Sequence, residues 1–301
     1  MSDSSERRRL AEYGRFLRLP FALAAPGLPL TGFLLAGGDW TRCPLYALLS
    51  VCGAALFSSF FAETGFPDVT SDGIPPGTRR AIRIVSFLLT LLFSSFRPET
   101  LTAAVLILLT GLAAPRIASV TFLRAACTAL RFVFLLALGM ALLPLTEMTS
   151  FLPCADFFAV GLFFYVYGLE EARGLRTLRP AVRPGGMPLI LGAGVCYLSI
   201  FFRLGRLQLQ GALVYVCGIL AALTAGIFFI IAWKAWRVFR SKSLPGIAKR
   251  WTDSLHLGLF FAEASAAAAA GSWLLSLVFL ILAASAKTIQ VQMERENENG
   301  V

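Results

Sequence analysis

Leu209 to Trp233 reads LQGALVYVCGILAALTAGIFFIIAW, 25 residues without one charged side chain. A stretch of about 20 mostly apolar residues is long enough to cross the hydrocarbon core of a membrane as an α-helix. Because backbone polar groups without partners are costly in lipid, such a stretch is stable there only when it is helical. This segment therefore predicts a helical membrane protein.

The composition of the whole chain agrees with this prediction. The 301 residues are 57% hydrophobic and 15% charged, with a mean hydropathy of +0.74. Soluble proteins have about 45–50% apolar and about 25% charged residues. A soluble enzyme is nearly excluded by these values, and so is a disordered chain, which needs low hydrophobicity and high net charge.

Further apolar segments follow one another along the chain. We predict membrane spans at 18–38, 44–62, 80–96, 100–115, 120–145, 152–169, 187–204, 209–233, 253–270 and 272–289. Some of these segments are short and separated by only one to three residues, so the pattern fits nine or ten spans. The expected fold is an all-α bundle of transmembrane helices. It forms a single domain, 18–289, between a cytoplasmic N-terminal segment, 1–17, and a polar tail, 290–301.

The net charge of +10 has a positional pattern. With ten spans and a cytoplasmic N-terminus, 22 of the 27 basic residues fall on the cytoplasmic side. Basic loops are retained on that side, so the charge indicates an orientation and not a nucleic-acid partner. Arginine greatly outnumbers lysine, which is typical of GC-rich genomes. We therefore expect a multi-pass protein of a bacterial inner membrane, with membrane lipids as its surroundings.

The first polar cluster follows the second predicted span. Asp68 and Asp72 are four residues apart, so on a helical turn they share one face and could bind a divalent cation together with a diphosphate. Arg79 and Arg80 follow on the same loop. The alternative is a plain cytoplasmic loop, in which Asp72-Gly73 forms a turn and the arginines fix the topology.

The second polar cluster follows the sixth predicted span. Glu170 and Glu171 precede Arg173 and Arg176, an order that suits a diphosphate bridged by a metal ion. The alternative is a helix end with charge pairs between successive turns. Both clusters follow an even-numbered span and are expected on the same side of the membrane, which favours one shared site.

A third charged position lies inside the fifth predicted span. Arg131 follows Arg124 by seven residues, so the two lie on one helix face. A charge at the depth of Arg131 is tolerated only beside a cavity or a partner. It could bind an anionic ligand or pair inside the protein, for example with Glu63.

Taken in order, these features resemble the UbiA superfamily of intramembrane prenyltransferases. The strings LRLP at 17–20 and TGFLLAGG at 31–38 resemble the first helix of that family. Thr64, Asp68 and Asp72 keep the spacing of its first aspartate motif.

The second motif of the family is present in a reduced form. Glu170, Glu171 and Gly174 occupy its place without an aspartate. This Glu-x-x-Gly form resembles a divergent, EboC-like branch of the superfamily.

The resemblance implies a fold and a reaction. The helices would surround a central cavity open to the cytoplasmic side, where Mg²⁺ and basic residues stabilise the diphosphate that leaves an isoprenyl chain. A lipophilic acceptor would capture the allylic carbocation. The implied metal ligands are Asp68, Asp72, Glu63, Glu170 and Glu171, with Asp68 and Asp72 as the catalytic residues. The implied diphosphate-binding residues are Arg79, Arg80, Arg173, Arg176 and Arg131.

Two other functions are compatible with the sequence. A catalytically degenerate protein of this kind would bind a polyprenyl or lipid ligand without turnover, and the missing aspartates of the second motif fit that reading. An unrelated transporter or channel is the other alternative, although the sequence shows no inverted repeat with paired broken helices.

Overall fold

The computed structural model describes residues 27–39, 76–95, 97–117, 121–143, 152–174, 186–206, 211–240 and 245–298. Within these ranges the secondary structure is entirely helical. The helices are α3 (Gly27–Leu35), α5 (Pro76–Ser94), α6 (Pro98–Arg116), α7 (Thr121–Met140), α9 (Leu152–Gly174), α10 (Met187–Leu204), α11 (Ala212–Arg240), α12 (Pro245–Ala269) and α13 (Trp273–Glu298).

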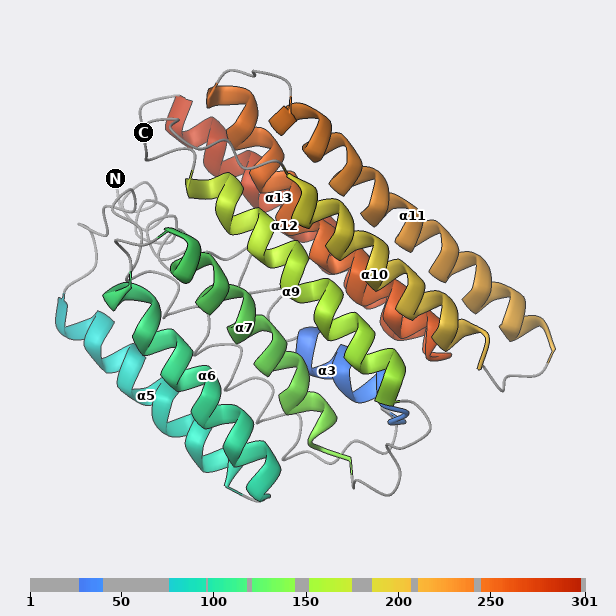
Figure 1. The fold of residues 1–301 in the computed structure, drawn as a ribbon, viewed down its shortest axis with the longest axis horizontal. Helices are drawn as coiled ribbons and strands as arrows, with labels where there is room; N and C mark the ends of the chain where they lie inside the picture. The colour runs from blue at the N-terminus through green and yellow to red at the C-terminus, as the bar shows by residue number, and fades with distance from the viewer. Residues whose placement is uncertain are drawn as a thin grey trace, which may run out of the picture.

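The long helices lie side by side in one bundle (Figure 1). From α5 to α13, each helix runs antiparallel to the one before it (Figure 1). The starts of α5, α7, α10 and α12 therefore share one end of the bundle with the ends of α6, α9, α11 and α13. We refer to this as the motif end, because it holds the start of α5 and the end of α9, which carry residues of the two predicted polar clusters.

The predicted spans that fall within the described residues overlap these helices. The span predicted at 187–204 has the bounds of α10. The break predicted between 96 and 100 lies slightly earlier, because α5 ends at Ser94 and α6 already begins at Pro98. The break predicted at Gly271 is present between α12 and α13. The all-α prediction is thus confirmed for the described residues. The span at 44–62 lies outside them, so the choice between nine and ten spans stays a prediction, as does the central cavity.

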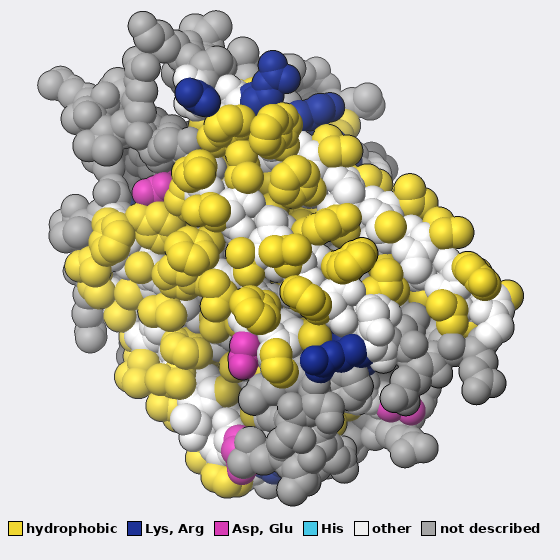
Figure 2. All heavy atoms as spheres, turned by 45° about the vertical axis from the view of Figure 1, so that its right-hand side comes forward, with side chains coloured by type: hydrophobic (Ala, Val, Ile, Leu, Met, Phe, Trp, Pro, Cys, Tyr) yellow, Lys and Arg dark blue, Asp and Glu magenta, His cyan; other side chains and the backbone are white. Residues whose placement is uncertain are grey.

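Several helices have the length and composition of membrane spans. Four described segments are long and apolar enough to cross a membrane: Phe122–Met140, Met187–Leu204, Ala212–Arg240 and Trp273–Gln292. Figure 2 shows a broad hydrophobic face, with basic side chains gathered near its upper end. A surface this apolar is unfavourable in water, and the structure therefore indicates a helical membrane protein.

The packing of α11 shows the same preference in detail. Many of its large apolar side chains point outward, including Ile219 at 62% and Leu223 at 61% exposed. Its buried side is made of smaller residues such as Ala221, Ala225 and Ala232. Small residues at helix contacts and large apolar residues facing outward are typical of bundles in lipid, because the lipid solvates the large side chains and small residues let the backbones approach.

The centre of the bundle is occupied by α12. This helix packs against α3, α9, α10, α11 and α13. Its side chains from Ala262 to Ala269 are almost all buried, as expected for a helix that other helices surround. The helix ends in a Schellman motif, in which the Ser272 amide donates to the Ala267 carbonyl at 2.9 Å. Gly271 supplies the required positive φ of 89°.

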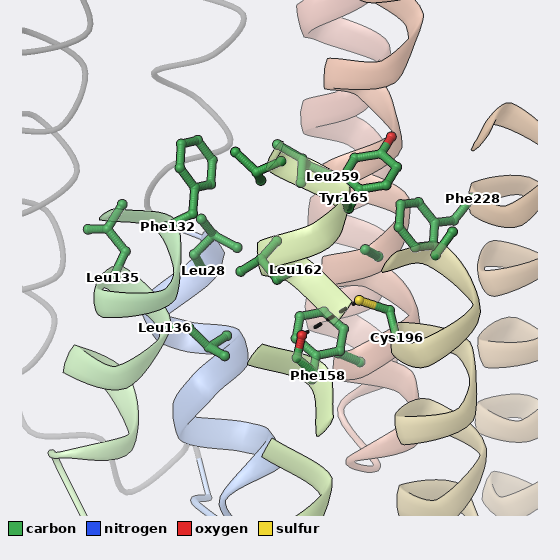
Figure 3. Close-up of a cluster of buried hydrophobic side chains, with 14 of the residues drawn as sticks. Leu28, Phe132, Leu135, Leu136, Phe158, Leu162, Tyr165, Cys196, Phe228 and Leu259 are labelled. Carbon is green, nitrogen blue, oxygen red and sulfur yellow. Dashed lines mark hydrogen bonds between the residues drawn. The ribbon is translucent and has the colours of Figure 1, made fainter. Parts of the chain in front are cut away.

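Glycine residues bring α9 and α10 into close contact. Gly161 lies opposite Cys196, and Gly168 lies opposite Leu189, which defines an antiparallel register. The Cys196 thiol donates to the carbonyl oxygen of Phe158 at 3.7 Å, as the dashed line in Figure 3 marks. These contacts hold α9 firmly against its neighbour, and α9 carries the second predicted cluster.

Candidate diphosphate and metal site

The last two turns of α9 carry the two glutamates of the second cluster. Glu170 is 3% exposed and is buried in the bundle, whereas Glu171 is half-buried. Because Glu, Ala and Arg are favourable helix residues, the helix continues through this polar segment to Gly174. The motif end of the bundle therefore holds one buried carboxyl and one that is half-buried.

Tyr167 positions the second of these carboxyls. Its hydroxyl donates to Oε1 of Glu171 at 2.9 Å, a contact that the four-residue spacing on one helix face allows. The ring of Tyr167 is stacked with that of Phe163, with centroids 6.2 Å apart. It also lies edge-on to Phe122 of α7 at 5.8 Å. Glu171 is therefore fixed at the contact between α7 and α9.

The contact between α7 and α9 determines how far Arg131 lies from the motif end along the bundle. The side chain of Arg131 is buried, at 3% exposed. Phe122, near the start of α7, contacts Tyr167 near the end of α9. At a rise of about 1.5 Å per residue, Arg131 lies about 13 Å from Phe122 toward the opposite end of the bundle, and Glu170 lies about 5 Å from Tyr167 toward the motif end. The helix rise thus sets the backbone of Arg131 about 18 Å from that of Glu170 along the bundle axis.

The remaining predicted site residues divide into two groups. Arg79 and Arg80 belong to the start of α5 and Arg173 to the end of α9, so all three backbones lie at the motif end, but the described side chains do not include theirs. The predicted residues that lie outside the described ranges are Glu63, Asp68, Asp72 and Arg176. Among the described side chains, no three His, Cys, Asp or Glu residues lie close enough to hold a metal ion.

The chemistry of the described part of the site suits a hard cation. Carboxylate oxygens are the ligands that Mg²⁺ prefers, and Mg²⁺ is commonly held by one or two carboxylates together with substrate phosphates. Glu170 and Glu171 supply such oxygens at the motif end. Either carboxylate could contribute one ligand to a set that a diphosphate, or carboxylates from the first cluster, would complete.

Tyr167 is the residue of this site to which sequence reasoning assigned no role. Its spacing of four residues from Glu171 is the signal that could have revealed it, because residues four apart on a helix are neighbours. Its contacts with Phe122 and Phe163 depend on tertiary packing and could not be predicted from the pattern.

Comparison with known proteins adds no family assignment. The chain matches no protein-family model, no curated protein and no solved structure.

Proposed function

We propose that this chain is an integral membrane prenyltransferase that transfers an isoprenyl group from an isoprenyl diphosphate to an aromatic or other lipophilic acceptor in a Mg²⁺-dependent reaction. The setting would be a bacterial inner membrane, with the motif end facing the cytoplasm. The observation that carries the proposal is the position of Glu170, a carboxyl buried in an apolar bundle at the end where α5 begins. The resemblance to the UbiA superfamily supports the same reading.

The two predicted clusters have different parts in this proposal. Asp68, Asp72, Glu63, Glu170 and Glu171 would hold Mg²⁺, which would neutralise the charge that develops on the departing diphosphate. Arg79, Arg80, Arg173 and Arg176 would bind diphosphate oxygens through paired N–H donors.

Arg131 has a separate place in the proposal. Its backbone lies about 18 Å from that of Glu170 along the bundle. Arg131 would therefore contact the ligand only at a point further from the motif end than the other arginines.

The helices around the site would bind the isoprenyl chain. α7 and α9 present Phe122, Phe163 and Tyr167 next to Glu171. Aromatic side chains provide a large apolar surface, and their polarizable rings attract a nearby cation. This surface would stabilise positive charge on the allylic carbon as the diphosphate leaves.

The proposal is tested by an assay of diphosphate release and product formation. The purified full chain in lipid nanodiscs would be mixed with labelled isoprenyl diphosphates of several lengths, Mg²⁺ and a panel of lipophilic acceptors. We expect diphosphate release coupled to prenylation of an acceptor. Asp68→Ala, Asp72→Ala and Glu170→Gln should each reduce the rate by about 100-fold, the scale typical for groups that hold or orient a metal.

Asp156 offers a matched control. It is an exposed carboxylate on the same helix as Glu170, near the opposite end of the bundle, and Asp156→Asn should leave the rate unchanged. If the protein binds isoprenyl diphosphate tightly but releases no diphosphate, the transferase function would be refuted. That result would support a binding protein without turnover. Release that is unaffected by the three site variants would refute the assignment of the site.

A further inference from the structure

A second carboxyl group is buried in the bundle, apart from the candidate site. Glu263 lies in α12 and is 0% exposed. Neither of its carboxyl oxygens has a hydrogen-bond partner among the described residues. The carboxyl group lies directly against the backbone of Gly27, the first residue of α3, where even a β-carbon would overlap it. The side chain is thus enclosed between α12 and α3.

The described surroundings of Glu263 offer little to neutralise a negative charge. Gly27 has no side chain, and Thr31, one turn further on α3, is fully buried with a hydroxyl oxygen that also lacks a hydrogen-bond partner. The neighbouring positions of α12 are small residues such as Ala262 and Ala264. An ionised carboxylate here would have lost its hydration without gaining donors from these residues.

The other ionisable groups of the packed helices do not hydrogen-bond to Glu263. Helix α3 carries no ionisable side chain, and the ionisable side chain of α13 between Trp273 and Gln292, Lys287, is exposed. Other ionisable side chains are buried in the described parts of α12 and of the helices packed against it. They are Cys154, Tyr165, Glu170, Cys196, Arg203, Cys217 and His256. The Tyr165 hydroxyl donates to the Leu255 carbonyl.

These observations decide between a bound metal cation and a bound proton. A buried carboxylate without compensation takes up a proton rather than remain charged. A metal cation is disfavoured here, because it needs several oxygen ligands and the neighbouring side chains named above are small and apolar apart from Thr31.

We propose that Glu263 is a proton-binding site inside the bundle and that its neutral form is required for the contact between α3 and α12. When the O–H bond breaks, the proton passes to water and the carboxylate keeps the electron pair. The charged form needs water or donors that the contact with Gly27 does not supply, so deprotonation separates α3 from α12. Proton occupancy thereby controls the packing of α3.

Infrared spectroscopy tests the protonation directly. The full chain in micelles of a detergent without ester or acid groups would be recorded at neutral pH, where exposed carboxyls are ionised. We expect a carbonyl band of a protonated carboxylic acid in the wild type, its loss in Glu263→Gln and its retention in Glu99→Gln, since Glu99 is exposed in the first turn of α6. Absence of the band from the wild type, or a band of undiminished intensity in Glu263→Gln, would overturn the proposal.

A second variant keeps the test decisive if Glu263→Gln does not fold. Glu263→Asp retains a carboxyl group in the same contact, so the band should persist at a shifted frequency. A band that does not shift in Glu263→Asp would show that it arises from another group, and would refute the assignment to Glu263.

Hydrogen exchange tests the coupling to α3. Exchange of the peptide from α3 would be measured from neutral to alkaline pH and divided by that of a peptide from α10 in the same sample. We expect this ratio to rise with pH in the wild type and to stay constant in Glu263→Gln. A constant ratio in the wild type would refute the coupling. Slower exchange of α3 on replacing choline chloride by sodium chloride at fixed pH would show that Na⁺, not a proton, is the ligand.

Discussion

Tyr165 joins α9, α11 and α12 through one fully buried side chain. Its hydroxyl donates to the carbonyl oxygen of Leu255 at 2.7 Å, and its ring centroid lies 4.8 Å from that of Phe228. The hydroxyl fits because position 258 of α12 is glycine, where a β-carbon would overlap it. Figure 3 shows Tyr165 beside Phe228 and Leu259. We expect Tyr165→Phe and Gly258→Ala to be strongly coupled.

The magnitudes follow from these contacts. Tyr165→Phe removes one hydrogen bond and should cost about 1 kcal/mol of unfolding free energy. Gly258→Ala gains about 1 kcal/mol of helix propensity but forces the hydroxyl out of its place, which costs about 1–3 kcal/mol, so we expect a net loss of about 1 kcal/mol. In the Tyr165→Phe background the overlap is gone, and the nearest ring carbons lie 3.4 Å from the new methyl group. Gly258→Ala should then be neutral or stabilising.

The assay is the free energy of unfolding in mixed micelles, measured for the wild type, both single variants and the double variant. The double variant should be more stable than the sum of the single effects predicts, with a coupling of about 1–2 kcal/mol. Additive effects, with Gly258→Ala equally costly in both backgrounds, would refute the packing of Tyr165 against Gly258.

Three further predictions can be measured on the same preparation. Gly192→Ala should destabilise the protein by about 2 kcal/mol, because the methyl group would lie 2.6 Å from the Gly161 carbonyl oxygen. Gly194→Ala, which has open space around the new methyl group, should leave the stability unchanged. Equal losses of stability in thermal unfolding would contradict this prediction. Arg97→Met should cost about 1 kcal/mol by removing the 2.7 Å hydrogen bond to the Leu142 carbonyl oxygen, with no change in diphosphate release; a change in release would be the unexpected result. Removal of Mg²⁺ with a chelator should abolish diphosphate release and restored Mg²⁺ should recover it, whereas release that persists would contradict the proposed metal.

The helices could be predicted well because membrane spans follow from local composition. The span at 187–204 and the break at Gly271 both depend on properties that the sequence shows directly, namely hydropathy and a glycine at a helix end. The end of α11 was less predictable. The apolar pattern stops at Trp233, but the helix continues to Arg240, because charged residues end the apolar segment without ending the hydrogen bonding of the helix.

The candidate site was predictable only in its coarse position. The parity of the spans predicts that the start of α5 and the end of α9 share one end of the bundle, as Figure 1 shows. The level of Arg131 relative to Glu170 could not be predicted, because it depends on the contact between Phe122 and Tyr167. The isolation of Glu263 was equally hidden, since it results from Gly27, more than two hundred residues earlier in the chain, covering its carboxyl.

The central place of α12 has a consequence for how the bundle is assembled during synthesis. The helix packs between elements that leave the ribosome earlier, from α3 to α11. At about 5–20 residues per second, the chain between the end of α11 at Arg240 and the end of α12 at Ala269 takes on the order of seconds to appear. During that time the small-residue face of α11 and the contact surface of α3 have lipid as their neighbour. The bundle closes only when its last pair of helices has been inserted.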